Sequence, residues 1–294
     1  MKGEINMVQN YVLLTDSSSD ICKELAQELD IRVLPLDVIF EGGKCVRNDE
    51  IDPKYFYERL RAKETITTSA VRMERFAAVM AEIAEEGKDV LYLGFSSGLS
   101  ATYQAGKVAA IEMSEKYPER KFMAVDTLCA SLGQGLLVTY AARMRKAGNS
   151  MEEVAQWVED NKLHLCHWFT VDDLFFLKRG GRVSAATAVM GSMLAIKPVM
   201  HTDNAGKLTN VGKVRGRKAS IDALFEKLKT TSLDLAGQTI YISHGDCIED
   251  ARYLADRIRR ELGVEDIMID YVGPVIGAHS GPGTLALFFL GRER

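Results

Sequence analysis

Runs of apolar residues alternate with segments of helical periodicity along almost the whole chain. The apolar runs YVLLTD, DVLYLGFS and FMAVDT predict buried strands at 11–16, 89–96 and 122–127. Helical patterns fall at about 19–29, 50–63, 71–86, 101–117, 132–147 and 151–163. Parallel strands need long, usually helical crossovers, so this alternation favours a mostly parallel sheet with helices on both faces. The chain is therefore predicted to have an α/β fold.

A second series of the same kind begins near His167. Strands are predicted at 168–173, 239–245, 266–273 and 285–291, and helices at about 185–200, 220–230 and 248–262. The length of 294 residues suits two domains of ordinary size. We place the boundary at the end of the helix that contains Trp157. The prediction is an N-terminal domain over 1–165 and a C-terminal domain over 166–294, packed directly together, each with a mostly parallel sheet flanked by helices.

Charge and cysteine usage exclude several classes of protein. The chain has 37 Lys and Arg against 41 Asp and Glu, a net charge of -4, which argues against a general nucleic-acid partner. Its five cysteines are scattered without a CxxC pair, which fits neither a zinc site nor a disulfide framework and suits a reducing cytoplasm. His164 and His167 have metal-pair spacing but no third ligand cluster, so no metal is predicted.

One long uncharged stretch, residues 271–291, raises the question of a membrane span. It contains His279, two prolines and a GPG sequence, which would break a spanning helix. The first ten residues, MKGEINMVQN, have no apolar core of the kind that signal peptides carry. We therefore expect no integral membrane segment and a cytoplasmic protein.

Small polar residues cluster where three predicted strands end. The clusters are TDSSSD (15–20), GFSSGLSATYQ (94–104) and VDTLCASLGQG (125–135). Ligands of open α/β sheets bind beyond the carboxyl ends of the strands, where helix N-termini attract anions. Serine, threonine and aspartate are also the usual N-caps, and capping alone explains any single cluster. Three clusters on one sheet edge favour a binding site for an anionic group.

His279 is the most suggestive histidine, since it lies in GAHSGPG beside Ser280. Tight turns at a strand end are expected to hold it, and a purely structural role is the simpler interpretation. A hydrolase would pair Ser97 or Ser100 with His279 and Asp16. The G-x-S-x-G elbow of such enzymes is absent, because GFSSGLS has its glycines in another frame. The glycine pair in LKRGGRVS (177–184) likewise lacks the spacing of a phosphate loop.

Several segments together resemble the DegV family of bacterial fatty-acid-binding proteins. They are TDSSSDI (15–21), TTSAV (67–71), SSGLSATYQ (96–104), VDTLCASLGQGLLV (125–138), FFLKRGGRVS (175–184), GSMLAIKPV (191–199), GKLTNVGKVRGRKAS (206–220) and GAHSGPGTLALFF (277–289). Each segment is weak alone, but their order and spacing span nearly the whole chain. The resemblance implies two α/β domains with a long-chain fatty acid, such as palmitate, stearate or oleate, buried between them.

The resemblance also implies a role and a set of site residues. The family has no catalytic activity of its own and needs no cofactor. It presents the fatty acid carboxylate to a partner fatty acid kinase, which makes an acyl phosphate for phospholipid synthesis. By motif, the carboxylate contacts fall on Thr68 and Ser100, with Ser96 and Ser97 as alternatives for the closest contact. Arg182 and His279 surround them as ligand-binding residues.

Two details bear on these assignments. The family usually has glycine where this chain has Ala101 and proline near Arg72, which affects the loop shape but not the hydroxyls. In VRGRKAS, the cations Arg215, Arg217 and Lys218 lie within four residues and are predicted to bind the kinase. A solvated charged turn before the helix at 220 is the alternative. A serine esterase or thioesterase remains the alternative function.

Overall fold

The computed structural model describes residues 10–184 and 195–294. Its first sheet has the strand order β2-β1-β6-β7, and every pairing in it is parallel. The strands are β1 (Tyr11–Asp16), β2 (Ile31–Leu34), β6 (Asp89–Gly94) and β7 (Phe122–Asp126). Helices cover both faces, so this part of the fold was predicted correctly.

The helices on the two faces belong to different hydrophobic clusters. On one face lie α1 (Lys23–Glu28), α5 (Ser131–Lys146) and α6 (Met151–Asn161), and on the other α3 (Met73–Glu85) and α4 (Thr102–Lys116). Side chains alternate along β1, so Leu13 packs towards α5 while Leu14 packs towards α3 and α4. The first predicted helix, at about 19–29, is shorter than expected. A 3-10 turn, η1 (Ser17–Ser19), precedes it.

The second sheet has six strands in the order β10-β9-β8-β13-β11-β12. They are β8 (Leu165–Thr170), β9 (Ile196–Thr202), β10 (Leu208–Arg215), β11 (Ile240–His244), β12 (Ile267–Tyr271) and β13 (Leu285–Leu290). Only β11 and β12 pair in parallel, and the other four pairings are antiparallel. A mostly parallel sheet was therefore wrong for the C-terminal half. The short link between β9 and β10 makes a hairpin, and β13 inserts antiparallel between β8 and β11.

The helix predicted at about 185–200 is also corrected where the structure describes it. Ile196–Thr202 is strand β9, and residues 185–194 lie outside the described part of the chain. Pro198 is tolerated in this strand because β8 pairs with β9 only at Met200 and His201. The strand predicted at 168–173 begins three residues earlier, at Leu165.

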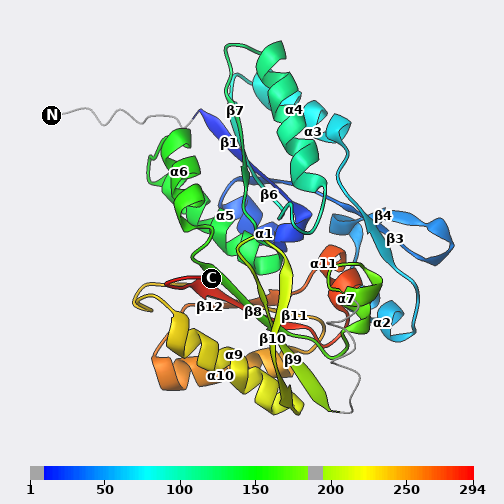
Figure 1. Ribbon diagram of the computed structural model, residues 1–294. Helices are drawn as coiled ribbons and strands as arrows, with labels where there is room; N and C mark the ends of the chain where they lie inside the picture. The colour runs from blue at the N-terminus through cyan, green and yellow to red at the C-terminus, as the bar shows by residue number, and fades with distance from the viewer. Residues whose placement is uncertain (1–9, 185–194) are drawn as a thin grey trace.

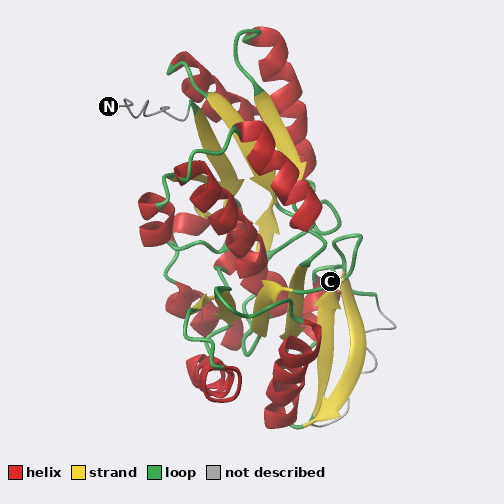
Figure 2. Cartoon of the chain, turned by 90° about the vertical axis from the view of Figure 1, so that its left-hand side faces the viewer, coloured by secondary structure: helices red, strands yellow, loops and turns green. Residues whose placement is uncertain are grey.

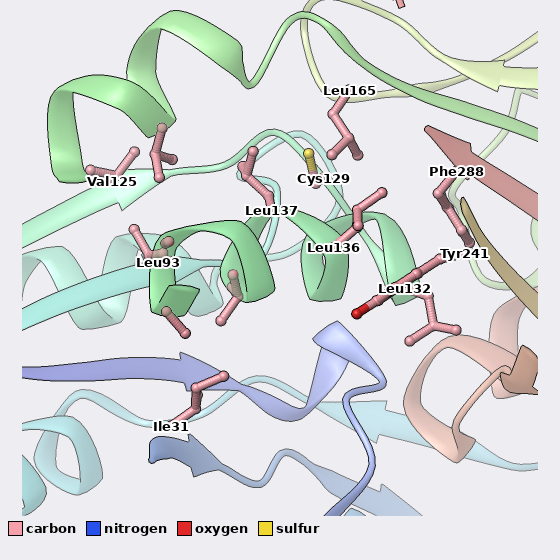
Figure 3. Packing of buried hydrophobic residues seen from close by; sticks show 14 of the residues in the cluster. Ile31, Leu93, Val125, Cys129, Leu132, Leu136, Leu137, Leu165, Tyr241 and Phe288 are labelled. Carbon is pink, nitrogen blue, oxygen red and sulfur yellow. The ribbon is translucent and has the colours of Figure 1, made fainter. Parts of the chain in front are cut away.

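Helix α5 lies between the two sheets and joins their cores (Figures 1 and 3). Its Leu132, Leu136 and Leu137 share one cluster with Leu93 of the first sheet and Phe288 of the second. The far face of the second sheet is covered by α9 (Arg217–Thr231) and α10 (Ile248–Leu262), which form a separate cluster with it. Figure 2 shows the two sheets stacked along the long axis of the molecule. A domain boundary at 165 and 166 stays a prediction.

A third, smaller sheet completes the wall beside the two main sheets. Its order is β4-β3-β5, from β3 (Asp37–Ile39), β4 (Cys45–Arg47) and β5 (Thr67–Ser69). Next to it lie the 3-10 turns η2 (Glu41–Gly43) and η3 (Asn48–Glu50), with helices α2 (Pro53–Arg61), α7 (Phe175–Arg179) and α11 (Pro274–Ser280). Helix α11 contacts α2, α7, β3 and β5. The sequence patterns do not predict this sheet, α7 or α11, because all of these elements are short.

Candidate functional site

A cavity lies between the two main sheets, walled by α5, α7, α11 and β5. Its floor is the inner face of the second sheet, with Phe169, Ala286 and Phe288. Side chains from the other elements close it, including Phe95, Leu177 and Val275. Of the residues that line it, fourteen are apolar, so most of the wall is hydrocarbon. Such a space suits a slender apolar ligand.

Thr68 and His279 form a hydrogen-bonded pair on the cavity wall. Thr68 Oγ1 lies 2.7 Å from His279 Nε2, although the two residues are 211 positions apart in the chain. Strand β5 supplies the threonine and α11 the histidine. His279 therefore lies in the last turn of a helix, which corrects the prediction of tight turns at a strand end. A side chain at Gly180 would come within 2.4 Å of His279 Nδ1, so the glycine makes room for the ring.

The imidazole of His279 is neutral at ordinary pH. Burial lowers its pKa to about 4, and the nearby guanidinium groups of Arg182 and Arg179 add to the effect. A neutral ring has one N–H donor and one ring acceptor. It can therefore exchange hydrogen bonds with Thr68 and with a ligand without adding a positive charge.

Ser100 and Arg182 line the same cavity. Ser100 Oγ accepts a hydrogen bond of 3.2 Å from the Thr102 amide and lies 3.0 Å from the Thr102 hydroxyl, so it also caps the start of α4. The guanidinium of Arg182 donates to the Gly180 carbonyl. Burial lowers the pKa of Arg182, and in the described part of the chain no carboxylate forms an ion pair with it. An anion in the cavity would meet this uncompensated charge.

Ser97 does not join the cavity. It is exposed, its amide donates to Asp126, and it is not among the residues that line the wall. Ser96 is buried but donates to the Gly206 carbonyl at 2.8 Å. Of the serines in this loop, only Ser100 therefore faces the cavity.

Asp16 is committed to its own surroundings. Its carboxylate accepts hydrogen bonds from Ser18, from Tyr92 Oη at 2.7 Å and from the Phe95 amide at 3.0 Å. Burial raises its pKa. It makes none of the hydrogen bonds recorded for His279, so the serine triad considered above does not assemble in the described structure. The TDSSSD cluster is thus a capped turn, as its simpler interpretation held.

Comparison with known proteins places nearly the whole chain in one family. Residues 10–292 match the family model described as "Uncharacterised protein, DegV family". A DegV domain-containing protein of Clostridium perfringens is 47% identical over 286 residues, covering 97% of this chain and 98% of that protein. The chain belongs to the DegV family.

Solved structures agree with this assignment. A DegV family protein from Thermus thermophilus, described by its fatty acid binding, superposes with a TM-score of 0.85 at 31% identity, covering 96% of this chain and 99% of that one. DegV of Bacillus subtilis, described as a fatty acid binding protein, gives a TM-score of 0.83 at 30% identity, covering 97% of this chain and all of that one. This DegV protein therefore has fatty-acid-binding structural relatives and their α/β fold.

Several lining residues of the DegV cavity were not predicted. They are polar groups on α5, α11 and the second sheet: Ser131, His167, Thr202, Ser243, Ser280 and Thr284. His167, considered above only as a metal ligand, lies 3.0 Å from the Leu165 carbonyl through Nδ1 and accepts from the Ala130 amide at 3.4 Å. Burial lowers its pKa well below the ordinary value. Ser131 lies in one of the three polar clusters, and Ser280 and Thr284 lie in the GAHSGPGTLALFF segment, but neither pattern assigned these residues to a ligand.

The predicted partner-binding cations have different surroundings. Arg215 is exposed at the end of β10. Arg217 forms ion pairs with Asp250 at 2.8 Å and with Asp172 at 3.7 Å, so its charge is compensated within the chain. Lys218 lies over the Tyr253 ring, 5.6 Å from its centroid. Arg217 thus resembles a structural residue, and Arg215 is the most available of the three.

The uncharged stretch at 271–291 forms α11 and β13. None of the helices described for this chain is long and apolar enough to cross a bilayer. In the same described residues no group of three or more His, Cys, Asp and Glu side chains is arranged to hold a metal ion.

Proposed function

We propose that this DegV protein is a cytoplasmic carrier that binds a long-chain fatty acid, such as palmitate, stearate or oleate, and presents its carboxylate to a partner fatty acid kinase. It acts without a cofactor and without catalytic activity of its own. The observation that carries the proposal is the Thr68 and His279 pair, set with Arg182 in the wall of a largely hydrocarbon cavity.

The head group fits the polar residues of that wall. The Thr68 and Ser100 hydroxyls can each donate to a carboxylate oxygen, and hydrogen bonds to a charged acceptor are stronger than neutral ones. Arg182 offers positive charge that no carboxylate of the described chain compensates. His279 stays neutral, because burial lowers its pKa to about 4, and it orients Thr68. Together these groups replace the water that a free carboxylate would lose.

The tail supplies most of the affinity. Burial of each methylene is worth about 0.8 kcal/mol, so a tail of about 14 methylenes gains roughly 11 kcal/mol. Immobilisation and ordering of the ligand cost at least about 4 kcal/mol. The difference is enough for tight binding before any head-group contact is counted.

The hydrolase alternative finds less support. An esterase or thioesterase needs a base with a pKa near the working pH, whereas burial lowers the pKa of His279 to about 4. The Nε2 atom of that ring is paired with Thr68 and not with a serine. Ser97 is exposed outside the cavity, and the hydrogen bonds recorded for Ser100 Oγ are with Thr102 and not with His279.

Presentation to a kinase is supported by the way the cavity meets the surface. Leu99, Arg182 and Leu208 line both the cavity and a surface groove that also includes Gly98 and Lys207. The head-group residue Arg182 thus borders the outside. A phosphoryl group delivered by a bound kinase would meet the carboxylate there. The positive charges of Arg182 and Lys207 would favour the acyl phosphate, which carries more negative charge than the carboxylate.

Mass spectrometry of the protein purified from its own cells tests the carrier role. We expect an intact long-chain fatty acid at close to one molecule per chain, and no turnover of acyl esters or acyl thioesters. Mixing the loaded protein with the kinase of the same cell and ATP should give an acyl phosphate, trapped as the hydroxamate. Ester turnover without a retained fatty acid would favour the hydrolase.

A further inference from the structure

The cavity has a second group of polar side chains besides those assigned to the carboxylate. Ser131, Ser243 and Ser280 all line it, and they come from the start of α5, from β11 and from the end of α11. Their exposed fractions are 5%, 0% and 5%. A hydrocarbon tail gains nothing from hydroxyls in such a place.

The three serines belong to one region of the wall. Ser131 Oγ lies 3.1 Å from Ser243 Oγ. Ser243 pairs across the sheet with Ala286, which also lines the cavity. The Ser280 carbonyl accepts a 3.0 Å hydrogen bond from the hydroxyl of Thr284, which directly precedes β13 and accepts a backbone hydrogen bond from Gly245, two residues after Ser243. Thr284 thereby ties the end of α11, where Ser280 lies, to the sheet beside Ser243.

Ser280 Oγ has no hydrogen-bond partner within the described chain, although the atom is fully buried. A serine hydroxyl in a helix can bond back to a carbonyl of the preceding turn, and this one does not. Both its proton and its lone pairs remain unused. A buried hydroxyl without a partner is costly, so it should find one on a bound molecule.

Ser243 has unused acceptor capacity for a related reason. Ser131 gives its hydroxyl proton to Asp20 Oδ2 at 2.6 Å. In the contact between the two serines either hydroxyl can donate, and in both cases the Ser243 oxygen keeps a lone pair available. The wall therefore offers a donor at Ser280 and an acceptor at Ser243.

We propose that Ser131, Ser243 and Ser280 form a second polar subsite, which accepts a hydroxyl group carried on the acyl chain of the bound fatty acid. The proposal rests on the fatty-acid function stated above. An alcohol both donates and accepts, so it matches Ser243 and Ser280 together, whereas a plain chain leaves Ser280 unpaired. Arg182 is the one Lys or Arg among the described residues that line the cavity, and it is already assigned to the carboxylate. The three serines therefore have no cation of their own to balance a second anionic group, so the subsite suits an uncharged group.

Competitive displacement of a fluorescent fatty acid from the delipidated full-length protein tests this. The competitors are stearic acid and a series of hydroxystearic acids that differ in the position of the hydroxyl. We expect the wild type to bind at least one isomer about tenfold more tightly than stearic acid, since a lost buried hydrogen bond has effects of this size. Ser280→Ala should abolish that preference and leave stearic acid binding unchanged or stronger.

Two further variants make the result decisive. Ser243→Ala should also reduce the preference, and it replaces Ser280→Ala if that variant does not fold. Ser114→Ala, which removes an exposed hydroxyl from α4, should behave as the wild type. Three results would each overturn the subsite. The wild type could bind no hydroxystearic acid more tightly than stearic acid, or that preference could survive in both Ser243→Ala and Ser280→Ala. Ser280→Ala could also lose the same affinity for every acid, stearic acid included. Failure of stearic acid itself to bind would instead contradict the proposed function.

Discussion

At the scale of single residues, Thr68 gives the most direct test of the head-group site. Thr68→Val keeps the shape of the side chain and its fit to a strand, but removes the hydroxyl. Loss of a hydrogen bond to a charged group should weaken fatty acid binding by about 1.5–3 kcal/mol. Isothermal titration of the delipidated protein measures this. Thr67→Val, at an exposed neighbour on the same strand, is the matched control and should bind as the wild type.

His279 should make stability depend on pH. Its pKa is lowered by burial to about 4 in the folded protein, from 6.5 in an unfolded chain. The unfolded state therefore binds more protons between these values, and the free energy of unfolding should fall as the pH drops from about 6.5 to 4. The contribution is at most about 3 kcal/mol. Urea titrations across this range should show a smaller decrease for His279→Gln. An unchanged decrease would contradict the assignment and point to His167.

The residues of the site differed in how visible they were in the sequence. Thr68, Ser100, Arg182 and His279 lie in motifs of the resemblance, and the structure places all four on one cavity wall. Ser243 lies in no such motif, and Ser280 lies in the same motif as His279 but was not assigned to the ligand. A serine in a strand or short helix is unremarkable until the fold brings it to a cavity. The surroundings of Arg217 were equally hidden, since Asp172 and Asp250 are distant in sequence.

At the scale of elements, the position of α11 decides where His279 lies. A side chain at Gly277 would come within 2.6 Å of the Tyr57 hydroxyl and 2.8 Å of the Phe56 ring on α2. Both aromatic residues are fully buried and cannot move aside. Gly277→Ala should therefore displace α11, lower the free energy of unfolding by about 1–3 kcal/mol and weaken fatty acid binding.

Chemical denaturation and ligand titration of the same protein samples check both effects. Gly212→Ala is the control, because its new side chain would meet only Val199, at 3.9 Å. Full stability in Gly277→Ala would mean that α2 and α11 are not in close contact. Unchanged binding despite lost stability would separate α11 from the site.

Periodicity predicted long elements well and short ones poorly. Helix α10 was predicted with its observed bounds, 248–262, because fifteen residues give a clear apolar stripe. Strands β3, β4 and β5 have three residues each, too few for any pattern to emerge. The antiparallel pairing of β13 depends on its position between β8 and β11, and strand patterns carry no information on such neighbours.

At the scale of the whole molecule, the two sheets enclose a site that neither forms alone. The residues proposed to bind the carboxylate come from β5, the loop after β6, the segment after α7, and α11, so both halves of the chain contribute to the cavity wall. This arrangement was implied by the family resemblance and not by the strand order. Helix α5 holds the halves together through a continuous apolar core, which explains how a cavity with so many contributors keeps its shape.

The proposed kinase must dock on this assembled molecule, and Arg215 is the residue that best tests where. It is exposed at the end of the edge strand β10, whereas Arg217 is already paired with Asp172 and Asp250. A positive charge at the surface steers encounter with an acidic partner more than it adds to affinity. Arg215→Glu should therefore retain its fatty acid, slow kinase-dependent phosphorylation and make the rate less sensitive to salt. Lys107→Glu, with the same change of charge on exposed α4, should keep the wild-type rate. Equal rates for Arg215→Glu and the wild type at low salt would place the docking surface elsewhere on the molecule.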